Sequence, residues 1–504
     1  MKDSLLTNPI VLFRRSISSR ILRCVCLLLM VGMLTTAQAA DWYVKASVKS
    51  GGEGSKKKPF NSLADAESAS GPGDTIYIVH SNNHSILDGQ ISLKPDQKLI
   101  GLGPDVTQVP EDAAAARITY SGWAGTGFPG GAVVQLSSGN EVRNIHFKDM
   151  SFDGILGFGS DFGEVKIHGN LFTHAPEFDF TVRSSIWFIS LSGNSDLIVK
   201  DNVIRDGESL WGVDTQMVGD SMVTCMYEGN QFESIGFPAY SFIAGDTSHL
   251  KADILNSSAN NIGALGAFSD LANSDSIAIN AFGSARMDVV VDGYTYDNTD
   301  QVGGESNTGL ELFTRGPTSG PPPSWADGAE LNLKIKNSSF SNAVTEAIQC
   351  LNGGFNVTMN IEITDTIVLD AKPRQIGSLL EDLSGGTVSG IRGAAISILP
   401  EFLTTGSQTT LKIENCDIIG SPGYAVGVYD AGTTGFTTTF DMGGGALGSM
   451  GYNRILENVE GEVELYQVNG IGESNWWGGV SPRVDILVGG SFDSDPELPA
   501  DPLQ

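Results

Sequence analysis

Residues 197–204 read Leu-Ile-Val-Lys-Asp-Asn-Val-Ile, and this short phrase decides the fold. It has the form apolar, any, apolar, any, turn residue, any, any, apolar, and nine copies occur between Ile145 and Ile418. The copies begin at Ile145, Val165, Leu197, Cys225, Ala252, Val289, Leu333, Ile361 and Leu411. When they are aligned on their apolar pairs, the turn position holds Asp149, Gly169, Asp201, Gly229, Asn256, Gly293, Asn337, Asp365 and Asn415. All nine are Gly, Asn or Asp, the residues that tolerate a left-handed backbone.

Each copy predicts a short strand, a sharp corner and the start of a second strand. Alternation places every second side chain on one face, so a chain that turns in this way winds into coils with an apolar interior. Stacked coils pair through their backbones, which gives a parallel β-solenoid of about ten to twelve coils. The alternative is a two-sheet β-sandwich, but sandwich turns do not recur in one register over such a length. The spacing of the copies varies, which predicts insertions between some of them, and either an insertion or an unrecognised coil in the longest step, from Asp365 to Asn415.

Residues 1–39 have the composition of an export signal. Basic residues such as Arg14 and Arg15 precede an apolar run over residues 24–34, and Ala37 and Ala39 form an Ala-x-Ala cleavage signal. The run is too short to cross a bilayer, so the alternative is a buried N-terminal helix. We predict that the mature chain has no transmembrane segment and is secreted, either extracellular or in the periplasm or cell envelope.

The charge of the chain restricts its partners. The formal net charge is −29, and removal of residues 1–39, with five basic residues and one acidic residue, changes it to −33. Nucleic acids and acidic membrane surfaces are therefore excluded as partners, because both require a positive patch. An acidic polysaccharide would be repelled unless a cation bridges it. Low-affinity Ca²⁺ binding is therefore possible, but the sequence does not define a site for it. No other cofactor is indicated.

The three cysteines of the mature chain, Cys225, Cys350 and Cys416, do not suggest disulfides. An odd and sparse count is unlike that of a disulfide-stapled secreted protein. Cys225 and Cys416 occupy apolar or corner positions of the repeat, which predicts small core residues rather than metal ligands.

The segment before the repeats has a distinct pattern. Lys58-Pro59-Phe60-Asn61-Ser62-Leu63 leads into a short helix-like stretch, and Gly73-Asp74-Thr75-Ile76-Tyr77-Ile78 follows. This pattern resembles the entry coil of secreted right-handed parallel β-helix proteins of bacterial type, in the pectate-lyase-like superfamily. The resemblance implies that the helix caps the N-terminal end of the solenoid, where open strand edges and apolar columns need cover.

The C-terminal region shows a second resemblance to these proteins. Asp441-Met442-Gly443-Gly444, Asn475-Trp476-Trp477-Gly478 and Asp495-Pro496-Glu497-Leu498 are similar to their closing coils. The paired tryptophans favour a cover for the last coil, and stacking on sugar rings is the alternative. The predicted organisation is an export signal (1–39), an N-terminal cap with the first coils (40–110), the parallel β-helix (111–480) and a C-terminal tail (481–504).

Candidate functional residues are expected in the long intervals between copies, because loops on a rigid scaffold often have functional roles. The intervals are residues 205–220, 297–328 and 371–392. If they lie on one side, they would form a groove of aromatic and acidic residues. The ligand-binding candidates are Trp211, Asp214, Glu305, Glu311, Arg315 and Trp325.

The catalytic motifs of the best-known members of the superfamily are absent. Polygalacturonase-like hydrolases have Asn-Thr-Asp-Gly and Gly-His-Gly, whereas Asn298-Thr299-Asp300 is followed here by Gln301, and Gly-His-Gly does not occur. The Trp-Ile-Asp-His phrase of pectate lyases is also missing. The six histidines form no metal or triad spacing.

Two functional hypotheses follow, and no catalytic residue is assigned. The first is a non-catalytic protein of the cell exterior or envelope that binds glycans or a surface, or has a structural role. The second is a polysaccharide lyase or glycoside hydrolase that acts in a groove formed between coils, with two carboxyl groups as acid and base or nucleophile. In both, the expected partner is an extracellular polysaccharide or the cell surface.

Overall fold

A computed structural model describes residues 38–49, 51–81, 85–108, 115–121, 131–150, 153–173, 183–207, 210–263, 275–299, 308–314, 326–373, 393–400, 406–430 and 435–502. Residues Asp41–Gln504 form one compact unit. Of the predicted export signal, only the last two residues fall within the described ranges. Among the described residues, no helix is long and apolar enough to cross a membrane.

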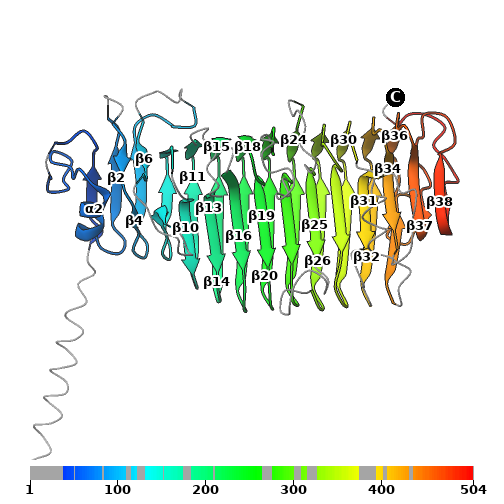
Figure 1. The fold of residues 1–504 in the computed structure, drawn as a ribbon, viewed down its shortest axis with the longest axis horizontal. Coiled ribbons are helices and arrows are strands. Elements are labelled where there is room, and N and C mark those ends of the chain that lie inside the picture. The colour runs from blue at the N-terminus through cyan, green and yellow to red at the C-terminus, as the bar shows by residue number, and fades with distance from the viewer. Residues whose placement is uncertain are drawn as a thin grey trace, which may run out of the picture. The chain divides into compact units, whose positions relative to one another are not determined.

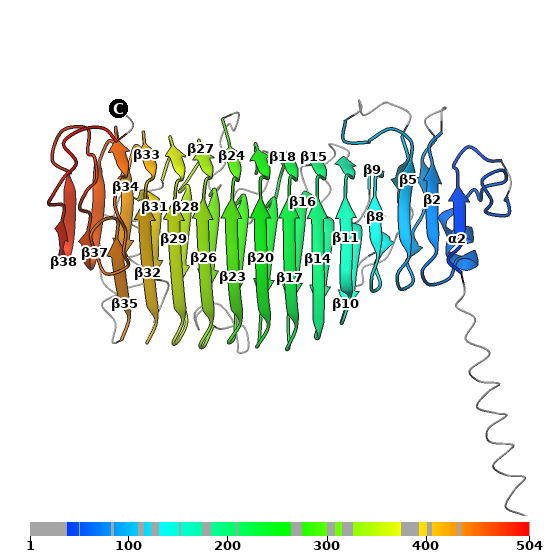
Figure 2. The same cartoon turned by 180° about the vertical axis from the view of Figure 1, so that it is seen from behind.

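The unit is built from three parallel sheets whose strands stack coil upon coil (Figure 1). Sheet 1 contains β1 (Asp41–Val44), β2 (Thr75–Val79), β5 (Lys98–Leu102), β8 (Glu141–Arg143), β11 (Gly163–His168), β14 (Asn194–Lys200), β17 (Met222–Glu228), β20 (His249–Leu255), β23 (Arg286–Asp292), β26 (Glu330–Lys336), β29 (Thr358–Thr364), β32 (Gln408–Glu414) and β35 (Thr437–Asp441). Figure 2 shows the strands from β14 to β32 lying side by side.

Sheet 2 is formed by a second set of stacked parallel strands. Its members are β4 (Ile91–Ser92), β7 (Ala132–Gln135), β10 (Asp153–Gly159), β13 (Arg183–Ser190), β16 (Leu210–Met217), β19 (Tyr240–Ala244), β22 (Ile277–Ala281), β25 (Leu310–Thr314), β28 (Ile348–Asn352), β31 (Ala394–Pro400), β34 (Tyr424–Tyr429), β37 (Gly461–Ile471) and β38 (Val484–Asp493). Strand β37 pairs with both β34 and β35, which joins sheets 1 and 2 at the C-terminal end. Parallel pairing continues into β38, beyond the predicted boundary at residue 480.

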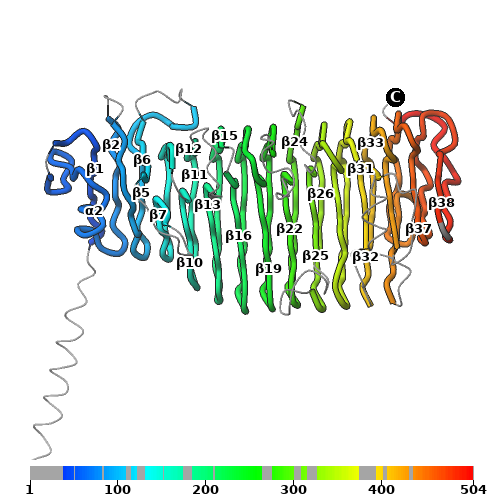
Figure 3. Tube along the Cα trace, in the orientation of Figure 1, coloured from blue at the N-terminus to red at the C-terminus, as the bar shows by residue number. Residues whose placement is uncertain are grey.

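Sheet 3 consists of short strands between the other two sheets along the chain. They are β3 (Leu87–Asp88), β6 (Arg117–Thr119), β9 (His146–Lys148), β12 (Leu171–Thr173), β15 (Val203–Gly207), β18 (Gln231–Ile235), β21 (Ser258–Asn260), β24 (Thr295–Asp297), β27 (Ser339–Ser341), β30 (Ile367–Leu369), β33 (Asp417–Ile419) and β36 (Arg454–Leu456). The trace follows one coil after another in chain order (Figure 3). The protein is therefore the predicted all-β, right-handed parallel β-helix.

The predicted corners explain why the chain turns between sheets 1 and 3. All nine turn residues have positive φ, from 48° at Asn256 and Asp365 to 69° at Gly293. Eight copies of the phrase lie on consecutive sheet 1 strands, from β11 to β32. The alignment of the first copy is wrong by one strand. Its apolar pair, Ile145 and Phe147, flanks His146 in β9 of sheet 3, whereas the sheet 1 strand of that coil is β8 and its corner is Asn144, with a φ of 55°. Strands β29 and β32 pair directly, so the 50-residue step contains an insertion and no additional coil.

Buried asparagines stabilise the backbone immediately after the corners. The side-chain Nδ2 of Asn170 donates to Oδ1 of Asn202 at 3.0 Å, and Nδ2 of Asn202 donates to Oδ1 of Asn230 at 3.0 Å. Each amide also donates to a backbone carbonyl, as Asn202 does to Ile167 at 3.0 Å. This ladder satisfies polar backbone groups that the corner would otherwise leave without partners in the interior.

The interior is a continuous column of apolar side chains. The repeat positions Val165, Leu197, Cys225, Ala252 and Val289 are all buried in one core cluster that extends along the coils. The three cysteines of the described region are buried and free, which confirms the prediction for Cys225 and Cys416.

Both ends of the column are covered as the sequence predicts. Helix α2 (Leu63–Ala69) begins after Ser62, whose hydroxyl accepts a hydrogen bond from the backbone N–H of Asp65, and it buries Leu63 and Ala66. At the other end Trp477 is buried and contacts Phe492 edge-on, with 6.2 Å between the ring centroids. Trp477 therefore packs into the last coil, whereas Trp476 is only half-buried, with the guanidinium carbon of Arg454 5.8 Å from its ring centroid.

Candidate functional site

Sheet 2 presents a row of aligned residues on its outer face. Leu310 and Leu312 belong to the core, so Glu311 between them points away from it, and the same alternation applies to Asp214 between Val213 and Thr215. The strand register aligns the outward residues of successive coils. We call this set the acid row, and it consists of Trp187, Asp214, Ser241, Ala278, Glu311, Gln349, Ser397, Gly427 and Glu464.

Asp214 is a buried carboxyl group within this row. Its side chain is 4% exposed, and Oδ2 accepts a hydrogen bond from Nε2 of Gln216 at 2.7 Å. Burial raises the pKa of Asp214 to about 6, while hydrogen bonds from Gln216 and from the Ser241 hydroxyl act in the opposite direction and the Asp153 carboxylate raises it further. A carboxyl group of this kind holds its proton at weakly acidic pH.

Asp275 and Glu311 form a second acidic feature three coils further along. Asp275 precedes β22 by two residues and is completely buried, and Glu311 on the neighbouring strand β25 is 6% exposed. Burial raises the pKa of Asp275 well above its ordinary range, and the adjacent Glu311 carboxylate raises it further. Hydrogen bonds from Thr308 lower it. Because two close carboxylates disfavour double ionisation, the pair holds one proton as a unit.

A third acidic group lies towards the C-terminal end of the same face. The Tyr429 hydroxyl donates to Oε2 of Glu464, and both residues are buried. Burial raises the pKa of Tyr429 well above its ordinary value, and Glu464 and Glu346 raise it further. This tyrosine is therefore a hydrogen-bond donor and not an anion.

An aromatic platform lies at the opposite end of the acid row. The indole of Trp211, at the start of β16, stacks on the ring of Phe237 with 5.6 Å between centroids and an interplanar angle of 16°. Trp211 and Asp214 are on one strand, so the platform is next to the first buried carboxyl group.

The structure places three of the six predicted candidates in strands of sheet 2. Trp211, Asp214 and Glu311 lie in strands, whereas the sequence predicted loops around them. The reason is that residues 205–220 contain β15 and β16, whose alternation was hidden by Gly207 and Gly212. Glu305, Arg315 and Trp325 lie outside the described residues.

Sequence reasoning missed Asp275, Glu346 and Glu464. The available signal was an acid between two apolar residues of a short strand, as in Val463-Glu464-Leu465. Asp275 and Glu346 precede their strands and show no comparable signal. Among the described residues, no group of three or more His, Cys, Asp or Glu side chains is arranged to hold a metal ion.

Similar solved structures share the chain path at low identity. One is the catalytic unit of a thermostable GH87 α-1,3-glucanase from Streptomyces thermodiastaticus strain HF3-3, with 11% identity, a TM-score of 0.43, and coverage of 86% of this chain and 64% of that chain. A rhamnogalacturonan lyase has 11% identity, a TM-score of 0.27 and coverage of 91% and 87%. The A-module of the Azotobacter vinelandii mannuronan C-5 epimerase AlgE4 has 10% identity, a TM-score of 0.30 and coverage of 87% and 94%.

The likeness to these structures is limited to the fold. This chain spans slightly less than two thirds of the glucanase unit. No protein-family model matches the chain, and no curated protein matches it.

Proposed function

We propose that this protein is a glycoside hydrolase that cleaves a neutral glycan at the acid row. The single observation behind the proposal is the alignment of two buried carboxyl groups on sheet 2, Asp214 and Glu311, with the buried Asp275 next to Glu311. We infer that it acts outside the cytoplasm, a proposal that rests on the export signal predicted for residues 1–39.

The proposed reaction requires one carboxyl group that donates a proton and one that is ionised. Asp214 suits the donor role, because a pKa of about 6 keeps it protonated in weakly acidic solution. In the Asp275–Glu311 pair, the shared proton leaves one carboxylate free to activate a water molecule. The proton passes from Asp214 to the glycosidic oxygen while the pair removes a proton from the attacking water.

The register favours inversion of the anomeric centre over retention. Asp214 and Glu311 are three strands apart, roughly 14 Å between their Cα atoms at the usual strand spacing. Their side chains can lean towards one another along the row and still leave room for a water molecule, whereas a retaining pair is only about 5 Å apart. We therefore expect the product to have the inverted configuration.

The substrate class follows from charge. The acid row contains no Lys or Arg, and the whole chain has a net charge of −29, so a polyuronate would meet repulsion without a compensating cation. Trp211 and Phe237 provide an apolar face on which a sugar ring of a neutral chain can stack.

The purified protein should be incubated with neutral polysaccharides and with polyuronates at pH 5, and the release of reducing ends measured. Asp214→Asn and Glu311→Gln should each lower the rate by about 100-fold or more. The matched control is Asp196→Asn, an exposed aspartate on β14 of sheet 1, which should keep full activity. NMR of the first product identifies its anomeric configuration.

Different outcomes would support different functions. Binding of a glycan without any cleavage would overturn the hydrolase and favour the competing hypothesis of a non-catalytic binding protein. New unsaturated ends from a polyuronate would instead identify a lyase. Full activity in both acid-row variants would move the catalytic site elsewhere on the molecule.

A further inference from the structure

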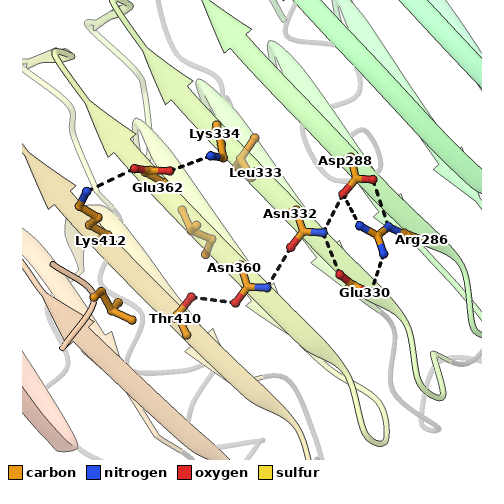
Figure 4. Close-up of a pocket in the computed structure, with 12 residues that line it drawn as sticks. Arg286, Asp288, Glu330, Asn332, Leu333, Lys334, Asn360, Glu362, Thr410 and Lys412 are labelled. Atoms are coloured by element: carbon orange, nitrogen blue, oxygen red, sulfur yellow. Dashed lines mark hydrogen bonds and ion pairs between the residues drawn. The ribbon is translucent and has the colours of Figure 1, made fainter. Parts of the chain in front are cut away.

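A groove of about 540 Å³ crosses the outer face of sheet 1, on strands β23, β26, β29 and β32 (Figure 4). Its volume is within the usual range for small-ligand sites. The groove belongs to a different sheet from the acid row, and none of its lining residues is among the catalytic candidates. Its function is therefore a separate question.

A chain of hydrogen bonds crosses the groove from strand to strand. Oγ1 of Thr410 donates to Oδ1 of Asn360 at 2.9 Å, and Nδ2 of Asn360 donates to Oδ1 of Asn332 at 2.9 Å. Nδ2 of Asn332 donates in turn to Oδ1 of Asp288 at 2.7 Å. These residues occupy equivalent positions on four consecutive strands, so the chain fixes the direction in which each amide and hydroxyl points (Figure 4).

The ladder keeps hydrogen-bonding capacity for a ligand. An amide has two N–H donors and an oxygen with two lone pairs, and a hydroxyl has two lone pairs. Within the described residues, Asn360 uses one N–H and Thr410 uses its hydroxyl proton, so a second N–H and two lone pairs are available at neighbouring coils. A donor beside an acceptor matches the hydroxyl groups of a sugar, which both donate and accept.

The lining is electrically neutral in a strongly acidic protein. Three cationic side chains face three carboxylates, namely Arg286, Lys334, Lys412, Asp288, Glu330 and Glu362. They pair with each other, as in Lys334–Glu362 at 3.2 Å, Lys412–Glu362 at 3.3 Å and Arg286–Glu330 at 3.3 Å. A polyanion or polycation would have to break such pairs, whereas an uncharged polyol would not.

The C-terminal wall of the groove is apolar and rigid. Leu447 lines the groove from the loop that follows β35. The Asp441 carboxylate accepts hydrogen bonds from four backbone N–H groups of this loop, including Gly445 at 3.1 Å and Leu447 at 2.8 Å. The loop therefore holds Leu447 in place as a surface for the C–H face of a sugar ring.

We propose that this groove is a second, non-catalytic binding site for a neutral oligosaccharide, with Asn360 and Thr410 as its hydrogen-bonding contacts and Leu447 as its apolar contact. The site goes beyond the proposed hydrolase function and does not depend on it. The groove and the acid row lie on different sheets and share no lining residue, so a substitution in one leaves the other set of side chains unchanged.

The test is affinity gel electrophoresis of the full chain in gels that contain dextran, galactomannan, a soluble mixed-linkage β-glucan or, as a charged probe, alginate. The Asp214→Asn, Glu311→Gln double variant serves as the parent, so hydrolysis cannot change the gel. Asn360→Ala with Thr410→Ala should reduce the retardation by a neutral polysaccharide at least tenfold in apparent affinity. Thr224→Ala is the matched control, because Thr224 is an exposed residue of the same row on β17, outside the groove.

Three results would contradict a neutral-glycan site in this groove. Unchanged retardation in the Asn360→Ala, Thr410→Ala variant would place glycan binding elsewhere, and retardation by alginate alone would overturn the neutral class. Absence of retardation by every neutral probe would also refute it. Thermal denaturation of each variant excludes loss of folding as the cause. The Asn360→Ala, Thr410→Ala variant with an intact acid row should hydrolyse a short soluble substrate at the wild-type rate. This result separates the groove from the proposed active site.

Discussion

Replacement of Asp214 by asparagine should make the protein more stable at pH 8 but not at pH 3.5. The pKa of Asp214 is about 6 in the folded protein, above its ordinary value of 3.8 because the carboxyl group is buried. The folded state therefore binds this proton more tightly than the unfolded state. The resulting contribution to stability is complete below about pH 4 and is lost as the pH rises through about 6.

The size of the effect follows from the difference between the two pKa values. At about 1.4 kcal/mol per pKa unit, the ionised carboxylate costs about 3 kcal/mol at pH 8 relative to the protonated form. An asparagine has nearly the same shape, stays neutral and can still accept the hydrogen bond from Gln216. The difference in free energy of unfolding between the Asp214→Asn variant and the wild type should therefore be more favourable to the variant at pH 8 than at pH 3.5, by up to about 3 kcal/mol.

Urea unfolding of the wild-type protein and the Asp214→Asn variant at pH 3.5 and pH 8, followed by tryptophan fluorescence, measures this difference. Asp196→Asn is the control, because it makes the same substitution at an exposed position of sheet 1. The reasoning would be refuted by a stability difference that is the same at both pH values, or by a variant that is less stable than wild type at pH 8.

Two further substitutions test the scaffold. Asn337→Val should lower the free energy of unfolding by about 1 kcal/mol or more, because Asn337 has a φ of 50° and a β-branched residue disfavours this backbone conformation. Thermal denaturation measures the effect, and Asn337→Gly should be less destabilising. An unchanged melting temperature in Asn337→Val would contradict the corner assignment. Asp441→Ala should lower the free energy of unfolding by about 1–3 kcal/mol, because four backbone N–H groups lose their acceptor. The loop that contains Leu447 should then be cleaved faster in limited proteolysis. Resistance equal to that of the wild type would show that the loop does not need the carboxylate.

The sequence predicted the fold well because its strongest signal is local. A corner with positive φ restricts one position to Gly, Asn or Asp, and this restriction repeats wherever the chain turns. The first copy was misaligned because Ile145 and Phe147 flank His146 in β9, a strand of sheet 3, and the corner after that strand, Asp149, also has positive φ, at 49°. Two classes of corner can therefore satisfy the same short pattern, and only the strand pairing distinguishes them.

The candidate site was less predictable because it depends on register between coils. Asp214 and Glu311 are 97 positions apart in the chain, and nothing local indicates that they occupy the same row. The number of residues between successive strands of sheet 2 varies with the insertions, so the alignment of β16 with β25 cannot be counted from the sequence. The groove of sheet 1 was missed for a different reason. Its residues belong to regular strands, whereas the sequence pattern favoured the irregular intervals as functional sites.

The acid row itself indicates that its carboxyl groups are not required by the scaffold. Ala278, Ser397 and Gly427 occupy equivalent positions on other coils, and the parallel pairing of their strands is uninterrupted. Small neutral side chains are therefore compatible with this row, whereas a buried carboxylate opposes folding at neutral pH. We therefore expect Asp214 to oppose folding at neutral pH, and the neighbouring coils show that its row does not need a carboxyl group. Groups of this kind are expected where function, rather than folding, determines the residue. If the Asp214→Asn variant is both more stable at pH 8 and inactive, the same substitution will have separated the two requirements.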